Sequence, residues 1–312
     1  MLRIASIGLG DIAQKAYLPI LCSHPEVTPI LCTRNTESLT ALAKQHRVDE
    51  CYSNLDSLIL ANPDAVMVHS STESHYQLAN TLIQNNIPVF IDKPISYNFD
   101  ETKQIIELAD SKNIPLFVGF NRRYAPLLVA LKNNDFTNLR LQKNRADITG
   151  KARFFIMDDF IHVADTLLHF SQSNEINEFQ VQTNWRDNEL AALHVQWSND
   201  NTHFQGSMNR VCGVTEERFE AFGQLQKWQI ENLSHGAHYQ KEKEDQLGFS
   251  DWDSTLLKRG FVDMIDDFIL QVRKRNVDHE YLQGIFDTHS LCERIIKTAI
   301  TQQPELRDRK KI

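Results

Sequence analysis

The first strand expected in this chain runs directly into two closely spaced glycines. Residues 2–7, LRIASI, form a short apolar run that suits a strand buried on both faces. The next six residues, GLGDIA, match the pattern G-x-G-x-x-A and open onto a helical pattern. Gly8 permits a tight turn, Gly10 lets a pyrophosphate approach the backbone, and Ala13 lets the helix pack close to the strand. The motif therefore predicts a dinucleotide site at a helix N-terminus. The alternative is a tight turn without a ligand.

The composition excludes several classes of partner. The 312 residues carry a net charge of −8, which argues against binding to nucleic acid or to an anionic membrane surface. No apolar run approaches the roughly 20 residues of a membrane span. The five cysteines are odd in number and form no CxxC pair, so we expect reduced thiols in a cytoplasmic protein without a zinc cluster. Because Met1 leads straight into the first strand, no signal peptide is expected.

Two patterns divide the chain near residue 121. Before it, strands expected at 27–32, 65–69, 88–92 and 115–120 alternate with helices at 36–46, with Thr36 as N-cap, 74–85 and 99–111. After it come a helix near 124–133, strands at 178–187, 190–198, 203–210, 218–222 and 227–231, an irregular segment at 232–253, and helices near 255–275 and 282–301.

This order predicts an α/β protein of two domains. Residues 1–121 form a Rossmann domain, a parallel doubly wound sheet with helices on both faces. Residues 122–312 form a C-terminal α/β domain with a mostly antiparallel open sheet. In this division the last helix could also pack back on the Rossmann domain.

Two constellations carry groups suited to catalysis. Lys93 follows an expected strand within Asp92-Lys93-Pro94, at the sheet edge where ligands of open α/β sheets bind. It could hydrogen-bond a substrate hydroxyl or a ribose and relay a proton; the alternative is a solvated lysine. Asp158, His162, Asp165 and His169 fall on one helical stripe bordered by apolar residues. There a carboxylate could orient an acid–base imidazole. A solvated face and a divalent-metal site remain open for this stripe.

Five segments occur in an order that resembles the Gfo/Idh/MocA oxidoreductase family. Within that family the chain most resembles the MviM-type members, which are sometimes labelled virulence factors. These segments are GLGDIA, HSSTESH at 69–75, DKP at 92–94, GFNRRYAP at 119–126 and D-x-x-x-H-x-x-D at 158–165. The resemblance spans nearly the whole chain. It implies NAD(P)-linked hydride transfer to or from a hydroxyl or carbonyl carbon, usually of a sugar or polyol. It also implies a C-terminal sheet that often mediates oligomerisation.

The resemblance also implies roles for individual residues. His162 matches the catalytic acid–base, Asp158 its paired aspartate, and Lys93 the assisting lysine. The expected cofactor-binding residues are Gly8, Gly10, Asp11, Ile12, Ala13, Thr33, Arg34, Ser71, Thr72, His75, Asp92 and Lys93. The expected substrate-binding residues are Asn121, Arg122, Arg123 and Asp165, and no metal ligand is assigned.

The chain departs from the family pattern near both ends of the site. Asp92 replaces the usual glutamate. Phe154, Phe155 and Phe160 stand where many members have glycines, and we expect them to narrow the substrate side. They motivate the alternative function, a catalytically silent NAD(P)-binding regulatory or interaction protein.

The cofactor preference is read after the second strand. No acidic residue follows that strand until Glu37, whereas Arg34 could pair with a 2′-phosphate. We therefore expect NADP in preference to NAD, with a plain surface arginine as the alternative.

The C-terminal sheet is the expected site of self-association. Its strands carry Gln182, Trp185, Gln196, Trp197, His203 and Trp228. Because tryptophan is favoured at interfaces, we expect a homodimer or larger homo-oligomer packed through the sheet face that helices leave open. A monomer with a hydrated face is the alternative. The only other partner expected is a small-molecule substrate.

Overall fold

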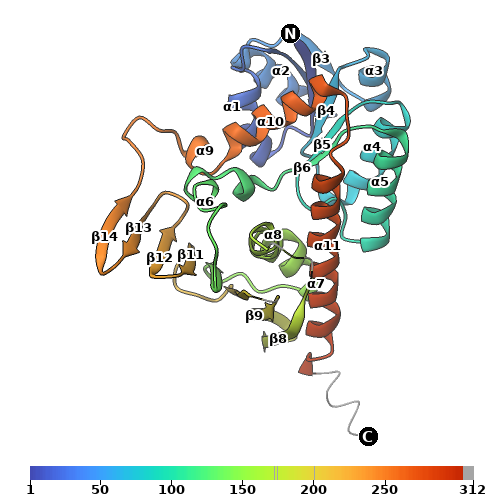
Figure 1. Cartoon of the computed structure of the whole chain (residues 1–312). Coiled ribbons are helices and arrows are strands. Elements are labelled where there is room, and N and C mark those ends of the chain that lie inside the picture. Colours follow the sequence, from blue (N-terminus) through green and yellow to red (C-terminus); the bar gives the residue numbers. More distant parts are fainter. Residues whose placement is uncertain (172, 174, 200, 305–312) are drawn as a thin grey trace, which may run out of the picture. The chain divides into compact units, whose positions relative to one another are not determined.

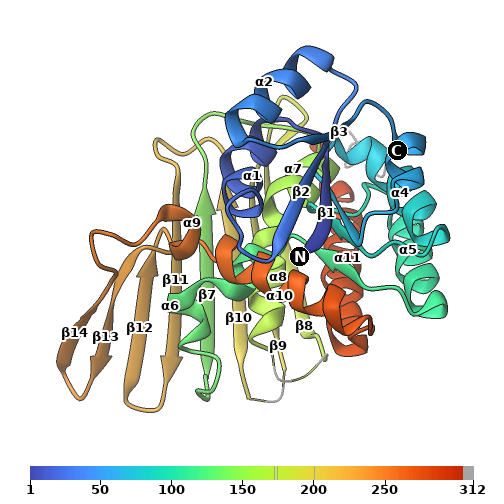
Figure 2. The same ribbon diagram turned by 90° about the horizontal axis from the view of Figure 1, so that it is seen from above.

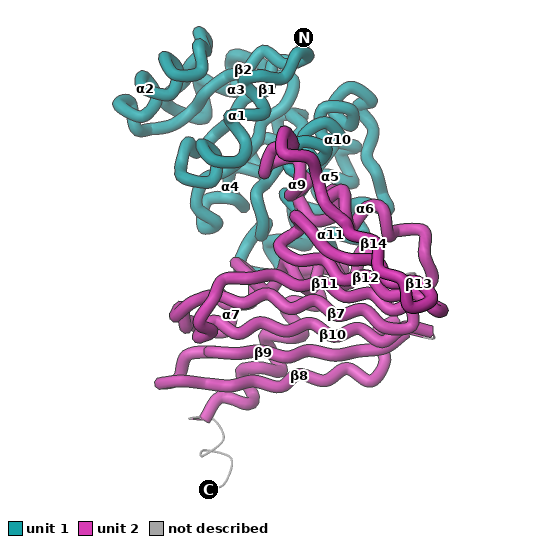
Figure 3. The backbone as a smooth tube through the Cα atoms, turned by 90° about the vertical axis from the view of Figure 1, so that its left-hand side faces the viewer, with its two compact units in different colours: residues 1–120, 261–286 teal, residues 121–260, 287–312 magenta. Residues whose placement is uncertain are grey.

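The structure is a computed structural model that describes residues 1–171, 173, 175–199 and 201–304 (Figure 1). The chain forms two compact units (Figure 3). Unit 1 comprises residues 1–120 and 261–286, and unit 2 comprises residues 121–260 and the chain from Asp287 onward. None of the helices within the described ranges is long and apolar enough to cross a membrane.

Unit 1 is built on a six-stranded parallel sheet in the order β3-β2-β1-β4-β5-β6. Its strands are β1 (Leu2–Ile7), β2 (Val27–Cys32), β3 (Glu50–Tyr52), β4 (Ala65–Val68), β5 (Val89–Ile91) and β6 (Leu116–Val118). Its helices are a π-helical turn (Ala13–Tyr17), α1 (Leu18–Leu21), α2 (Thr36–His46), α3 (Leu55–Leu60), α4 (Thr72–Gln84), α5 (Phe99–Lys112), α10 (Phe261–Lys274) and the start of α11 (His279–Ile300). Helices cover both faces of the sheet, with α1 on one and α4 and α5 on the other (Figures 1 and 2). The expected Rossmann fold is confirmed.

The start of α2 differs from the expected one by one residue. Asn35, not Thr36, is the N-cap, because its backbone is extended and its Oδ1 accepts a hydrogen bond from the Ser38 N–H at 3.0 Å. The expectation also lacked β3 and α3. Both are short, and the three residues of β3 are only half-buried, so neither has a strong hydrophobic period.

Unit 2 is built on an eight-stranded sheet in the order β14-β13-β12-β11-β7-β10-β9-β8. Its strands are β7 (Asn138–Asn144), β8 (Asn177–Arg186), β9 (Glu189–Ser198), β10 (His203–Asn209), β11 (Glu216–Gly223), β12 (Gln226–Glu231), β13 (His235–Gln240) and β14 (Lys243–Leu247). Neighbouring strands are antiparallel except β7 and β10, which are parallel. The helical segments are a 3₁₀ turn (Asn121–Tyr124), α6 (Pro126–Val129), α7 (Ala152–Phe155), a π-helical turn (Ile156–Phe160), α8 (Ile161–His169) and α9 (Thr255–Lys258). The expected mostly antiparallel sheet is confirmed.

Three expected elements of this region are wrong. The segment 232–253 is not irregular but holds the hairpin of β13 and β14, which escaped notice because β14 reads KEDQL and has no apolar face. The helix expected near 124–133 shrinks to the four residues of α6. The helix expected at 255–275 is interrupted at Gly260, whose φ of 78° ends α9 before α10 begins.

The two faces of the large sheet have opposite character. Along β10, Phe204, Gly206 and Met208 are buried, and α8 packs on this face over β7 and β10 (Figure 2). A Cβ on Gly206 would lie 2.9 Å from Val163 Cγ1, so glycine lets the helix approach the sheet closely. The opposite face carries polar side chains, such as exposed Arg140 and half-buried Gln205.

Two tryptophans expected to contribute to an open face lie on the covered one instead. Trp197 is 3% exposed and stacks on Phe204, and Trp228 is 5% exposed and packs against Phe136. The strand period places them with the core residues of β9 and β12.

Candidate functional site

The turn after β1 has the geometry of a phosphate cradle. Gly8 has a φ of 87°, and a Cβ there would lie 2.4 Å from the Ser70 backbone nitrogen, so no other residue fits. A Cβ on Gly10 would meet no atom within 4 Å, which leaves open space above the backbone at the start of the helix. Asp11 and Ile12 are exposed there, and Ala13 is fully buried. This open, glycine-lined helix start fits the pyrophosphate of a dinucleotide.

The ends of β2 and β4 supply further candidate cofactor residues at the same sheet edge. Thr33 is half-buried and Arg34 is exposed, and the first acidic residue after β2 is Glu37 in the first turn of α2. Ser71 is the N-cap of α4 and Thr72 its first residue. Parallel strands bring all these residues to one edge because their carboxyl ends point the same way.

His75 connects the loops after β4 and β5. It is 1% exposed, and its ring nitrogens lie 2.8 Å from the Pro94 carbonyl oxygen and 2.9 Å from that of Ser70. Because both nitrogens contact the chain itself, His75 fixes the loop that carries Lys93 rather than offering a free group to a ligand.

Asp92 contacts the backbone of Lys93 and the side chain of Tyr17 in the π-helical turn. Its Oδ1 accepts hydrogen bonds from the Lys93 N–H at 2.9 Å and from the Tyr17 hydroxyl at 3.3 Å. Burial raises the pKa of Asp92, and the positive charge of Lys93 opposes that rise. Sequence reasoning missed the neighbouring His69, which is 4% exposed and stacks on Tyr17 with ring centroids 3.9 Å apart. Burial lowers the pKa of His69 to about 3, so this imidazole is neutral.

In unit 2 the expected Asp/His stripe is split by the π-helical turn at Ile156–Phe160, which changes the angular register before α8. Between residues 155 and 167, Asp158 and His162 are half-buried and every other residue is buried. His169 is also half-buried, and burial lowers its pKa to about 3.

Asp165 is buried, whereas His162 is only half-buried. Asp165 is 1% exposed and accepts hydrogen bonds from Arg123 Nη2 at 2.5 Å and from the Thr288 hydroxyl at 3.0 Å. The expected substrate residues Asp165 and Arg123 therefore bind each other.

Arg122 makes a second buried ion pair. Its Nε and Nη2 each lie 2.6 Å from an oxygen of Glu217, and its Nη1 donates to Asn121 Oδ1 at 3.3 Å. Burial opposes ionisation of Glu217, but the charge and hydrogen bonds of Arg122 prevail and hold the pKa of that carboxyl below its ordinary value. Asn121 in turn donates to the Arg259 carbonyl oxygen at 2.8 Å. These groups brace the 3₁₀ turn against β11.

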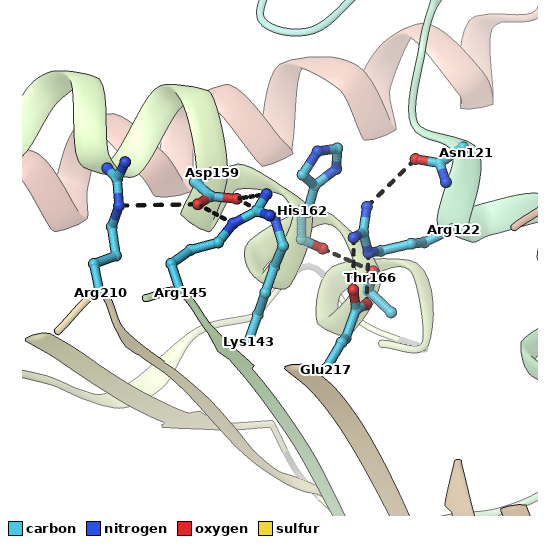
Figure 4. A network of polar contacts seen from close by, with 9 residues as sticks. All are labelled: Asn121, Arg122, Lys143, Arg145, Asp159, His162, Thr166, Arg210 and Glu217. Carbon is cyan, nitrogen blue, oxygen red and sulfur yellow. Dashed lines mark hydrogen bonds and ion pairs between the residues drawn. The ribbon is translucent and has the colours of Figure 1, made fainter. Parts of the chain in front are cut away.

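A third ionic group was missed by sequence reasoning altogether. Asp159 contacts Lys143 Nζ, and its Oδ2 lies 2.9 Å from Arg145 Nε and 4.0 Å from Arg210 Nε (Figure 4). The available signal was Lys143, a charge on β7 at a position where the strand period calls for an apolar residue. Figure 4 shows the His162 imidazole between this group and the Arg122–Asn121 pair, pointing away from the strands.

Two phenylalanines do not narrow a substrate side as expected. Phe155 and Phe160 are fully buried; the Arg210 guanidinium stacks over the Phe155 ring at 5.0 Å, and Phe160 packs toward Gly206. Both fill the space between helix and sheet. Phe154 is 42% exposed. In the part of the chain that the structure describes, no group of three His, Cys, Asp or Glu side chains is placed to hold a metal ion.

Comparison with known proteins assigns both halves of the chain. Residues 2–120 match the model described as the oxidoreductase family with NAD-binding Rossmann fold, and residues 126–257 match the YceM-like C-terminal domain. A crystal structure of a Gfo/Idh/MocA family oxidoreductase from Vibrio cholerae is 33% identical, with a TM-score of 0.92 over 97% of this chain and 99% of that one. The chain belongs to the Gfo/Idh/MocA oxidoreductase family.

Other relatives support this assignment. An oxidoreductase named YceM from Salmonella typhimurium is 29% identical over 308 residues, covering 96% of this chain and 99% of that protein. The structure of a dehydrogenase (MviM) from Clostridium difficile is 27% identical, with a TM-score of 0.89 over 95% of this chain and 99% of that one. This family member is therefore an NAD(P)-dependent oxidoreductase, and the cradle at Gly8 and Gly10 fits that cofactor.

Proposed function

We propose that this protein transfers hydride between NAD(P) and a carbon that bears a hydroxyl or carbonyl group, in a sugar, a polyol or a related small molecule. The observation that carries the proposal is the exposure pattern of residues 155–167. In this otherwise buried segment, an aspartate and a histidine four residues later are the side chains that reach the surface. Because the residues around Asp158 and His162 are buried, these two side chains are held in fixed positions. An acid–base group requires such positioning to reach the proton that it transfers.

We propose roles that suit the chemistry of each group. When bound, the nicotinamide accepts or supplies the hydride. His162 takes the hydroxyl proton or returns it to the carbonyl oxygen, Asp158 orients the imidazole, and Lys93 polarises the reacting oxygen. Asn121, Arg122, Arg123 and Asp165 support the substrate end mainly through the buried pairs they make with the chain.

The cofactor residues all belong to unit 1. We assign the pyrophosphate to the turn from Gly8 to Ala13, and the nicotinamide end to the loops of Ser71, Thr72, Asp92 and Lys93, with His75 behind them. Arg34, exposed after β2 with Thr33 beside it, supports a preference for NADP, because its guanidinium can pair with the 2′-phosphate.

A named relative supports the substrate class. A myo-inositol 2-dehydrogenase from Thermotoga maritima is 30% identical over 124 residues, covering 39% of this chain and 37% of that protein. The alternative, a catalytically silent cofactor-binding protein, was suggested by the phenylalanines near His162. Because Phe155 and Phe160 are buried against the sheet, most of the support for that alternative is lost. Hydride transfer to a CH–OH group is thus the function we propose.

Turnover tests the proposal. Wild-type protein with NADP⁺ or NAD⁺ is given a panel of polyols, aldoses, sugar acids and sugar phosphates, and reduced nicotinamide is followed by its absorbance. His162→Gln is expected to lower kcat roughly 10²- to 10⁴-fold with cofactor affinity unchanged. His169→Gln, on the same helix, is the matched control and should retain activity. Equal activity of His162→Gln and wild type would refute the role of His162.

A further inference from the structure

The covered face of the large sheet changes from apolar to cationic at one end. Leu141 is buried on this face, and Lys143, two residues further along β7, has the same orientation. Arg145 follows the end of β7, and Arg210 follows the end of the parallel neighbour β10. All three basic side chains turn toward Asp159 (Figure 4). A packed core does not require this concentration of charge, since an apolar residue would fill the same space.

The charges in this group do not balance. Asp159 is one carboxylate facing three cations. Arg122 is already matched by Glu217. The half-buried Asp158 acts on the charge of Arg210. When Lys143 is protonated, one positive charge is therefore left without a counter-charge among the groups named here. Because a buried charge is costly without a partner, the arrangement favours an additional anion.

Two features show where such an anion would sit. The Nε atom of Arg210 is buried and has no hydrogen-bond acceptor among the residues the structure describes. The Arg145 side chain is 37% exposed, so this end of the group is open to solvent. Burial and the charge of Arg122 hold the pKa of Lys143 at about 7, so its ammonium form is incompletely stabilised without a further negative charge.

We propose that Lys143, Arg145 and Arg210 bind an anionic group of the substrate, a carboxylate or a phosphate. This inference rests on the proposed function and narrows its substrate class to sugar acids or sugar phosphates. Asp159 precedes His162 by three residues, so an anion held at this group directs the rest of a small molecule toward Asp158 and His162. Guanidinium groups suit this role because their N–H groups match the oxygens of carboxylate and phosphate.

Binding of glucuronate and inorganic phosphate tests the inference without turnover. Calorimetric titration at constant ionic strength should show glucuronate or phosphate binding, with neutral glucose bound more weakly. Arg145→Gln and Arg210→Gln should each weaken anion binding roughly tenfold or more. Arg140→Gln, on the opposite face of β7, is the matched control and should bind as wild type. The anion that binds more tightly shows whether the substrate carries a carboxylate or a phosphate.

Inorganic phosphate could also occupy the turn at Gly10, and Gly10→Val separates the two sites because it leaves the sheet unchanged. If phosphate binding is lost in Gly10→Val and kept in Arg145→Gln, phosphate binds at the turn and not at the basic group. That result would overturn the assignment of a substrate phosphate to this group. The inference would be overturned if wild type bound glucuronate no tighter than glucose and also showed no phosphate binding that depends on the arginines. Unchanged binding of both anions by both arginine variants would overturn it as well.

Lys143 provides a second readout. Above neutral pH much of Lys143 is neutral, and a bound anion should raise its pKa, so anion binding should take up protons. Proton uptake is obtained by comparing the calorimetric binding heats in two buffers of different ionisation enthalpy. Lys143→Met should abolish this proton uptake. Binding without proton uptake would remove Lys143 from the site. Hydride transfer to neutral polyols without anion binding would refute this inference alone, whereas anion binding without hydride transfer would refute the proposed function.

Discussion

The Arg122–Glu217 pair should be among the most costly interactions in unit 2 to break from one side. Both side chains are nearly buried, at 6% and 10% exposure, and two N–O distances are 2.6 Å. Removing one partner leaves an unpaired buried charge, so Arg122→Met or Glu217→Met should each lower the free energy of unfolding by about 3–5 kcal/mol. The double variant Arg122→Met/Glu217→Met should cost far less than the sum, because neither charge of the pair then remains buried without its partner.

The assay follows from the position of the tryptophans. All four, Trp185, Trp197, Trp228 and Trp252, belong to unit 2, so their fluorescence during urea unfolding reports on that unit. The adjacent pair Arg218–Glu231 is the matched control. Its side chains are 47% and 32% exposed, so Arg218→Met should cost only about 0–1 kcal/mol. Equal small costs at Arg122 and Arg218 would show that an unpaired charge at the Arg122–Glu217 position carries no large penalty.

The same pair predicts a dependence on pH. Because the folded-state pKa of Glu217 is lowered, its contribution is fully present above the ordinary value of 4.5 and is lost as the pH falls toward the lowered value. Wild type should therefore lose more stability on acidification below 4.5 than the double methionine variant. A parallel decline of the two proteins would contradict the assignment.

Three further predictions concern the cofactor and the assembly. Gly10→Val should abolish calorimetric binding of NADPH without unfolding the protein, because its side chain fills the open space of the cradle, whereas Gly213→Val, which also meets no atom within 4 Å, should bind normally. Unchanged NADPH affinity in Gly10→Val would refute the site. Arg34→Ala should weaken NADPH binding by about 1.5–3 kcal/mol and NADH binding much less, and equal losses would show that Arg34 does not read the 2′-phosphate. Light scattering should give a multiple of the 36.0 kDa chain mass. We expect the protomers to pack through the polar face of the sheet, near Gln205. A mass that stays near 36.0 kDa on concentrating would contradict an oligomer.

The parallel sheet was predictable because its signals are local. Buried strands such as β4 and β5 are short continuous apolar runs, and the Gly8–Ala13 motif marks the first strand-to-helix turn within six residues. The β13–β14 hairpin was not predictable from periodicity, because β14 lies at the sheet edge and is polar on both faces. Its existence depends on pairing with β13.

The candidate site was predictable only where its residues lie close together in the chain. Asp158 and His162 could be read as a pair because they are four residues apart. The partners of Asp159 could not, because Lys143, Arg145 and Arg210 reach it only once β7 and β10 have paired in parallel. The same holds for Arg122 and Glu217, whose separation of 95 residues leaves no local pattern.

The most direct test of the central claim follows the hydride itself. Reduced cofactor that carries deuterium at nicotinamide C4 is incubated with the protein and a small-molecule extract of cells that produce it. Hydride transfer by this protein should place deuterium on a carbon that bears a hydroxyl group in one class of product. Labelling should be strongly reduced in His162→Gln and retained in His169→Gln. A wild-type protein that binds the labelled cofactor and transfers no deuterium to any molecule of the extract would contradict the proposed hydride transfer.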